Sequence, residues 1–335
     1  MQKARLRQAF GVVLVAAAGL GASLAQAAYV LTDFFRPGAA STALWDVNNT
    51  GLMVGYSTSG SGPLEVSTGF LYDGSSFTTL SGPAGAISSF ASGVSDAGVV
   101  VGSFTSTRVT NEQGDVVPGP SSSFIYTGGS YVRFDVPGAT QTYLRAISPD
   151  GRLVSGYYIN AAGRGVGFIY DITTGVRTDV SKANSLLTIA QGINNHGQMV
   201  GSDILTGPPT TRPGFVYDVA SNLRTDLAIP GMPRTAIRSI ADDGEMAGWF
   251  IDAAGLQHGF VGLTTGYEQI DFLGAGATYV EGSNNAGILV GGYTVGETTR
   301  AFIAMRVPEP GTWVLAGVAL LALGASRRRR SQTAD

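Results

Sequence analysis

The sequence predicts an all-β repeat protein: a six-bladed β-propeller closed by its N-terminal strand, with an N-terminal signal helix and a C-terminal transmembrane helix. Three observations lead to this prediction. A turn motif recurs six times, each repeat contains four β-type segments, and the two ends of the repeat array are offset in a way that suits a closed ring. Glycine and the β-formers Val, Ile, Thr, Tyr and Phe abound, while long helical patterns are absent.

The turn motif consists of a small residue, an apolar residue, two turn-forming residues, any residue and glycine, followed by a short β-type run. Asn, Asp and Ser start turns by hydrogen bonding to nearby backbone, and glycine takes the left-handed conformation that strains other residues. The copies read DVNNTG, GVSDAG, AISPDG, GINNHG, SIADDG and GSNNAG and end at Gly51, Gly98, Gly151, Gly197, Gly244 and Gly287. We therefore expect a hairpin turn between the first two strands of each repeat.

The third and fourth strands have signatures of their own. A phenylalanine follows a small residue on each predicted third strand, at Phe70, Phe124, Phe168, Phe215, Phe260 and Phe302. The fourth segment ends in aspartate at Asp33, Asp135, Asp179, Asp226 and Asp271. We expect the phenylalanines in a crowded core and the aspartates as turn caps, with a ring of cation sites as the alternative for the aspartates.

The ends of the array favour a closed ring. Residues 29–33 read as a lone fourth strand, and residues 300–307 read as a third strand that lacks a fourth. Pairing of these two segments completes the last blade and removes an unpaired edge. An open array of the same repeats, a β-sandwich and paired barrels are the alternatives.

Composition restricts the chemistry of the body. The chain has no cysteine, which excludes thiol nucleophiles and zinc-thiolate sites. Residues 28–310 carry 14 basic and 23 acidic residues and a single lysine, Lys182. Nucleic acid and anionic lipid require a basic patch, so we expect neither as a partner of the body.

No catalytic or metal-binding motif is apparent, and no cofactor is implied. The two histidines, His196 and His258, read as an exposed turn residue and a structural residue at the start of a strand.

The N-terminus has the order of a secretory signal peptide. Lys3, Arg5 and Arg7 precede an uncharged apolar run, and Ala25 and Ala27 supply the small residues that signal peptidase needs for cleavage before Ala28. The predicted domains are therefore a signal peptide (1–27), a six-repeat propeller (28–306) and a C-terminal tail (307–335).

The tail contains Pro308, Glu309 and Pro310, then an apolar run over residues 312–326, then a basic cluster of Arg327, Arg328, Arg329 and Arg330. As a helix, 15 residues reach about 22 Å, which is short of a bilayer core of ~30 Å. The arginines nevertheless favour a membrane segment whose C-terminal end stays in the cytoplasm.

These three elements resemble the PEP-CTERM sorting signal of Gram-negative bacteria. The resemblance implies that exosortase, a membrane-embedded enzyme, cuts near the Pro-Glu-Pro motif. It also implies an inner-membrane-anchored intermediate, followed by delivery to the cell surface or the extracellular polysaccharide matrix. A permanent single-pass anchor is the alternative.

The repeats are similar to the extracellular HAF repeats, which are named for His-Ala-Phe on the third strand. Here only His258 keeps the histidine and only Ala301 the alanine. This resemblance implies a fold and an extracellular location, but no chemistry.

Irregularities in the repeats indicate where a ligand would bind. The second repeat carries a long insert over residues 105–123 that includes Arg108, and Tyr157, Tyr158, Trp249 and Tyr293 lie near the same predicted face. Aromatic rings beside polar groups suit sugars. We therefore expect a non-enzymatic structural, adhesive or polysaccharide-binding protein. The alternative is a polysaccharide lyase or hydrolase, which would need paired carboxylates or a Tyr/His/Arg cluster.

Overall fold

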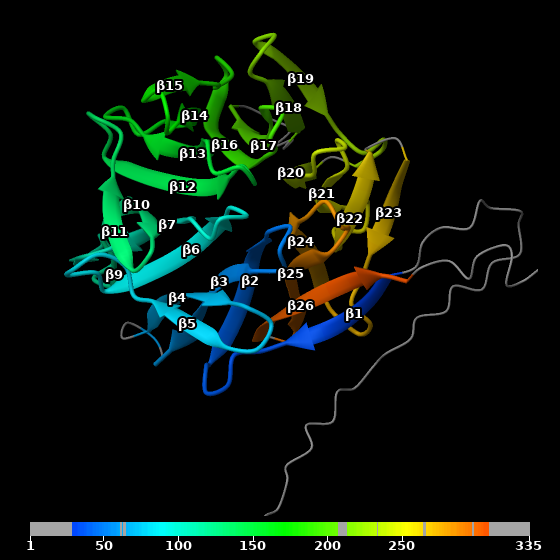
Figure 1. Ribbon diagram of the computed structural model, residues 1–335, viewed down its shortest axis with the longest axis horizontal. Helices are drawn as coiled ribbons and strands as arrows, with labels where there is room; N and C mark the ends of the chain where they lie inside the picture. The colour runs from blue at the N-terminus through cyan, green and yellow to red at the C-terminus, as the bar shows by residue number, and fades with distance from the viewer. Residues whose placement is uncertain are drawn as a thin grey trace, which may run out of the picture.

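The protein forms a ring of six four-stranded antiparallel blades around a central axis (Figure 1). The computed structural model describes residues 29–307 except 61, 63–64, 207–212, 233, 264–265 and 297. Within these residues every regular element is a β-strand, and there is no helix that is long and apolar enough to cross a membrane. The predicted signal peptide and tail segment lie outside the described residues.

The strands of the first five blades run in chain order from the axis outward, and in the sixth blade the first strand of the described chain lies outside the other three. The inner strands are β2 (Ser41–Val47), β6 (Ser88–Val94), β12 (Gln141–Ile147), β16 (Ser185–Ile193), β20 (Arg234–Ile240) and β24 (Ala277–Ser283). The second strands are β3 (Met53–Ser59), β7 (Val100–Thr105), β13 (Leu153–Ile159), β17 (Gln198–Leu205), β21 (Met246–Ile251) and β25 (Leu289–Val295).

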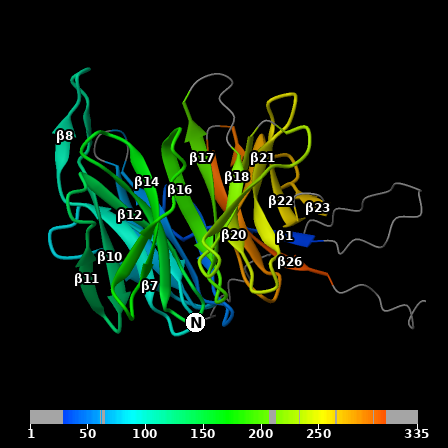
Figure 2. The ribbon, with the colours of Figure 1, turned by 90° about the horizontal axis from the view of Figure 1, so that it is seen from above.

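The outer half of each blade contains the predicted aromatic strand and the strand after it. The third strands are β4 (Val66–Tyr72), β10 (Ser121–Thr127), β14 (Gly165–Asp171), β18 (Gly214–Asp218), β22 (Gln257–Leu263) and β26 (Thr298–Arg306). The outermost strands are β5 (Phe77–Leu80), β11 (Ser130–Phe134), β15 (Val176–Asp179), β19 (Leu223–Leu227), β23 (Gly266–Ile270) and β1 (Tyr29–Phe34). The insert in the second blade forms a small hairpin of β8 (Arg108–Thr110) and β9 (Val116–Pro118), which projects from one face of the disc (Figure 2).

The first strand of the described chain closes the ring, as the sequence predicts. β1 pairs with β26 in antiparallel register from Tyr29↔Arg306 to Phe34↔Ala301 and is the outermost strand of the sixth blade. Arg306 reinforces the junction, since its Nε donates to the Tyr29 hydroxyl at 2.6 Å and its guanidinium pairs with Glu245. The 26 strands of the described residues lie between Tyr29 and Arg306.

Six apolar clusters hold the blades together, one at each blade-to-blade contact. Between the first two blades, for example, Val54 of β3 packs with Val100 of β7 and Phe124 of β10. Each cluster contains one of the six repeated phenylalanines, and all six are completely buried. Non-directional burial of this kind is the main stabilising contribution to a repeat fold without disulfides.

The small residues of the repeats mark close contacts between strands. A Cβ added to Gly167, which precedes Phe168, would lie 2.8 Å from Thr188 of the next blade. The predicted crowding of the third strand is therefore confirmed. A second glycine lies on the second strand of each blade, four or five residues after the turn glycine. In the fourth blade this is Gly201, where an added Cβ would overlap the carbonyl oxygen of Ile189 and lie 2.7 Å from the Phe215 ring.

Candidate functional site

The repeated turns lie around the axis on one face of the disc and bond to one another. All six turn glycines have positive φ, between 74° and 87°, which confirms the predicted hairpins. The side chain of the first turn residue organises the turn. In the first repeat, Asn48 Oδ1 accepts from the backbone N–H groups of Thr50 and Leu52. The same side chain reaches the next blade, because its amide donates to the Ser95 carbonyl at 2.8 Å.

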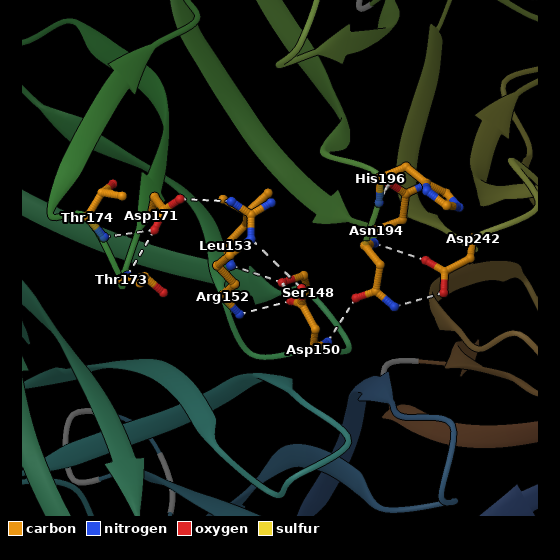
Figure 3. Close-up of polar contacts among 11 residues, drawn as sticks. Ser148, Asp150, Arg152, Leu153, Asp171, Thr173, Thr174, Asn194, His196 and Asp242 are labelled. Carbon is orange, nitrogen blue, oxygen red and sulfur yellow. Dashed lines mark hydrogen bonds and ion pairs between the residues drawn. The ribbon is translucent and has the colours of Figure 1, made fainter.

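The second turn residue links each blade to the next. Asn195 donates to Asp242 through its backbone N–H and its side-chain amide, both at 2.9 Å, and accepts from the Asp150 N–H at 2.8 Å. Figure 3 shows this arrangement, with the Asp150 backbone N–H and the Asp242 carboxylate bonded to the residue that follows Asn194. The complete circuit joins Asn49 to Asp96, Asp96 to Pro149, Asp150 to Asn195, Asn195 to Asp242, Asp242 to Asn285 and Asn285 to Asn49. We call these linked turns the turn ring. The sequence predicted the turns but not the bonds between them.

Every inner strand is bulged at the residue just before the turn motif. The pairing register with the second strand shifts at this point in all six blades. A bulge turns its extra side chain out of the ladder, and here the extra side chains line a cavity on the axis. The bulge residues are Trp45, Ser92, Arg145, Gln191, Arg238 and Glu281.

This axial cavity has a volume of about 30 Å³. The Arg145 guanidinium carbon lies 4.4 Å from the centre of the Trp45 ring, and Arg145 Nε donates to Gln191 Oε1 at 3.1 Å. Arg238 forms an ion pair with Glu281 at 3.5 Å. Burial lowers the pKa of Arg145, and the positive charge of Arg238 lowers it further. The axis therefore carries an unusual concentration of charge for the interior of a protein.

The residue after each bulge alternates between glycine and a larger residue around the ring. An added Cβ at Gly282 would lie 2.7 Å from the Cα of Asp46 in the next blade. Gly93 faces Ala146 and Gly192 faces Ser239 at the same distance. Asp46 is the single carboxylate at these positions, and Oδ2 accepts from the Val94 N–H at 3.0 Å. Desolvation at the wall of the axial cavity is the main cause that raises its pKa to about 7.

A second cavity lies beneath the inserted hairpin, on the face opposite the turn ring. Its volume is about 270 Å³, and we call it the hairpin cleft. Its lining residues are Gly62, Glu65, Ser67, Ser88, Phe90, Thr105, Arg108, Val116 and Pro118. Arg108 donates to the Glu65 carbonyl at 3.4 Å across the cleft. Phe90 packs edge-on against Tyr56, at 4.9 Å between ring centres, so the cleft adjoins the aromatic residues around the axis.

The five candidate ligand residues therefore separate into different environments. Arg108 lines the hairpin cleft. Tyr157 stacks on Tyr143 at 4.6 Å, and Trp249 lies 5.7 Å from the Arg238 guanidinium, so both belong to the layer around the axial cavity.

The other two candidates make structural contacts at the outer strands. Tyr158 donates to Asp179 at 2.9 Å, and Tyr293 donates to Asp33 at 2.6 Å. Tyr293 also stacks face to face on Phe272, with 3.8 Å between ring centres. Tyr157 and Tyr158 are consecutive in a strand and so point to opposite faces, which separates two residues that look equivalent in the sequence.

The strand-end aspartates bond to side chains instead of capping turns. Asp33 pairs with Arg300, Asp135 with Arg133 and Asp226 with Lys182. Buried inner-strand threonines take the capping role, since the Val136 N–H donates to Thr142 Oγ1 at 3.0 Å and the Ile229 N–H donates to Thr235 Oγ1 at 3.1 Å. Among the described residues, no group of three or more His, Asp or Glu side chains could hold a metal ion.

The two histidines have different surroundings. His196 is exposed, and its backbone N–H donates to Asn194 Oδ1 within the turn. His258 is the second residue of β22, and its Nδ1 lies 3.0 Å from Asp271.

The sequence carries a sorting signal that known proteins share. Residues 306–330 match the PEP-CTERM protein-sorting motif. This motif marks an exported protein with a C-terminal membrane-anchored intermediate that exosortase processes. Its Pro308, Glu309, Pro310 and arginine cluster lie outside the described residues, as do Ala25, Ala27 and Ala28. The match does not extend to the repeats, so their likeness to HAF repeats stays a prediction. No curated protein matches the chain.

Two solved structures share the fold at low sequence identity, and a third is a weaker match. A protein of unknown function from Dyadobacter fermentans is similar, with a TM-score of 0.56, 9% identity, and coverage of 83% of this chain and 98% of that chain. A sialidase from Trypanosoma rangeli in complex with sialic acid has a TM-score of 0.51 and 11% identity, and covers 88% and 61% of the two chains. The β-propeller domain of the Trilobed protease from Pyrococcus furiosus has a TM-score of 0.45 and 10% identity, with coverage of 79% and 95%.

Proposed function

We propose that this chain is a non-enzymatic protein of the cell surface or the extracellular matrix, where it has a structural or adhesive role and binds polysaccharide in the hairpin cleft. The sorting motif supports export. The cleft supports the choice of ligand, because it is the place where the irregular insert, an aromatic ring and charged groups meet.

The size and lining of the hairpin cleft suit a short stretch of a polysaccharide chain. At about 270 Å³ the cleft is close to the lower end of the range for small-ligand sites, which begins at about 300 Å³. Sugar rings present apolar C–H faces and hydroxyl edges. The half-buried Phe90 ring offers a surface for the faces, and Ser67, Ser88 and Arg108 offer partners for the hydroxyls.

The ionisable groups favour binding over catalysis. Glu65 is the one carboxylate among the described residues that line the hairpin cleft, whereas glycoside hydrolysis uses a pair. A lyase would need a deprotonated base. Tyr56 and Tyr157 adjoin the axis, and burial raises the pKa of both, so they stay protonated near neutral pH. These two sets of residues therefore support binding more than catalysis.

A binding experiment tests the proposal. Residues 28–306 are incubated with exopolysaccharide purified from the host, and the bound fraction is measured by pull-down and by surface plasmon resonance. Arg108→Ala should weaken binding about tenfold, because losing a hydrogen bond from a charged donor costs roughly 1.5 kcal/mol or more. Arg133→Ala removes an exposed arginine from β11 of the same blade and should leave binding unchanged.

Two results would overturn the proposal. If the unchanged protein binds no host exopolysaccharide, the ligand class is wrong. If the polysaccharide is shortened during incubation, as shown by new reducing ends or by unsaturated products that absorb in the ultraviolet, the protein is an enzyme.

A further inference from the structure

The axial cavity contains buried hydrogen-bond donors that have nothing to bond to. Ser92 Oγ, Gln191 Nε2 and Arg238 Nε are buried atoms without a hydrogen-bond partner among the described residues, and all three residues line this cavity. Ser92 and Gln191 are each only 4% exposed. Burying a hydrogen-bond donor without an acceptor is unfavourable, so three such donors around one cavity indicate that something occupies it.

The orientation of the Gln191 side-chain amide determines which of its two polar groups faces the cavity. Its Oε1 accepts from Arg145 Nε at 3.1 Å, and the opposite orientation of the amide would place two donors against each other. The Nε2 group must therefore face away from Arg145. Arg238 Nε carries a hydrogen and is likewise a donor, and its 3.5 Å contact with Glu281 is an ion pair without a hydrogen bond.

The charges at the axis leave one positive charge without a counterpart. Glu281 pairs with Arg238 at 3.5 Å and also attracts Arg145, so one carboxylate serves two guanidinium groups. Arg145 itself forms no ion pair within the described part of the chain. Its contacts are the Trp45 ring and Gln191, which are both neutral. Asp46 also lines the cavity, but its carboxylate is directed to the Val94 N–H, and its pKa of about 7 leaves it largely protonated below neutral pH. An isolated buried charge is costly unless it is paired.

The volume of the axial cavity limits the size of its occupant. A water molecule needs at least ~10–15 Å³ of such volume, so about 30 Å³ admits one small ion or two waters and excludes a sugar ring. Water would fill the space but would leave the charge of Arg145 unpaired. A small anion would accept from the free donors and neutralise that charge.

We propose that the axial cavity binds a single small inorganic anion of the size of chloride, between the Arg145 guanidinium, Gln191 Nε2, Ser92 Oγ and Arg238 Nε. The site joins inner strands of four different blades, so the anion links blades that share no direct backbone pairing on the axis. It is separate from the hairpin cleft and does not depend on polysaccharide binding.

Thermal unfolding of residues 28–306 provides the first test. Sodium chloride is titrated against sodium gluconate at constant ionic strength, because gluconate is too large for the cavity. Once chloride exceeds its dissociation constant, the unfolding temperature should rise by about 3 °C for each tenfold increase. Arg145→Gln should abolish this dependence. Arg177→Gln, at an exposed arginine that pairs with Asp179, should retain it.

A crystal grown in sodium bromide provides the second test and needs no variant. Anomalous scattering should show one bromide within hydrogen-bonding distance of Arg145 and Gln191. Waters in the cavity with no anomalous signal would overturn the proposal. An unfolding temperature that does not change with chloride concentration, or that changes only at molar chloride, would also overturn it. The bromide experiment keeps the proposal open to refutation even if Arg145→Gln does not fold.

Discussion

The backbone N–H of Asn285 donates a 2.9 Å hydrogen bond to Oδ1 of Asn49, a residue 236 positions earlier in the chain. This contact joins the sixth turn of the turn ring to the first. The ring is thus closed twice, by strand pairing at the rim and by turn contacts near the axis. The two closures involve different strands, so each can be tested alone.

Asn49→Ala should lower the free energy of unfolding by about 1–3 kcal/mol. The substitution removes the acceptor for the Asn285 N–H and the amide that donates to Asp96 at 3.0 Å, so two hydrogen bonds between blades are lost, each contributing roughly 0.5–1.5 kcal/mol. Asn111→Ala is the matched control, because Asn111 organises an exposed turn in the inserted hairpin through two bonds to Gln113 and Asp115. Urea unfolding of both variants measures the difference. Equal losses would mean that the bonds between blades add nothing to the turn itself.

Gly201→Ala should destabilise the fourth blade by about 3 kcal/mol or more. The added methyl group would overlap the Ile189 carbonyl oxygen and press on the buried Phe215 ring, neither of which can move freely. Gly266→Ala has open space around its Cβ and no left-handed backbone, so it should be close to neutral. Thermal unfolding separates the two outcomes. A mild Gly201→Ala would show that the inner strand can move away from the second strand.

Asp46 should make stability fall as pH rises through the weakly acidic range. Its pKa is 3.8 in an unfolded chain and about 7 in the fold, so the native state keeps a proton that the unfolded state releases. The free energy of unfolding should therefore decrease from about pH 4 to about pH 7 and level off above it, by an amount on the order of a few kcal/mol.

Asp46→Ser should remove this dependence of stability on pH, because another blade already has a serine at the equivalent position. Ser239 occupies the equivalent position, and its Oγ accepts from the Ser283 N–H at 3.0 Å. Urea unfolding at pH 5 and pH 8 gives the comparison, and subtracting one protein from the other cancels the contribution of the two histidines. Parallel pH profiles for the two proteins would contradict the assignment.

Replacement of Pro308, Glu309 and Pro310 by alanines should cause a membrane-associated precursor to accumulate. The matched PEP-CTERM motif includes these residues, and exosortase processing depends on it. Fractionation of cells followed by mass determination distinguishes precursor from product. Thr333→Ala, beyond the motif, should be processed normally. Normal release of the triple variant would indicate another processing route.

The fold was predictable because its information is local and repeated. Each turn needs its own glycine, and each third strand needs a phenylalanine after a small residue. Because the pattern occurs six times, it can be recognised even where a single copy departs from it. The closing strand was predictable for a different reason: a count of strands leaves residues 29–33 and the last third strand with only each other to pair with.

The axial residues were missed because they share a position but no chemistry. Trp45, Ser92 and Arg145 occupy the same place in successive blades, directly before the repeated motif, and a search for similarity passes over such a position. The sequence marks these positions in a different way, because the residue directly before the motif varies strongly although its place in the repeat is fixed. Tyr158 and Tyr293 are aromatic residues near the predicted ligand-binding face, but sequence alone does not tell which side of a strand faces the interior of its own blade.

The pairing of β1 with β26 also has a mechanical consequence. β26 ends at Arg306, where the sorting motif begins, so any tension on an anchored tail acts directly on this strand. β26 is held on one side by β25 and on the other by β1. A pull along its length loads both ladders in shear, so that many bonds share the force and must fail together. A tethered domain attached in this way can resist drag at the membrane without opening its ring.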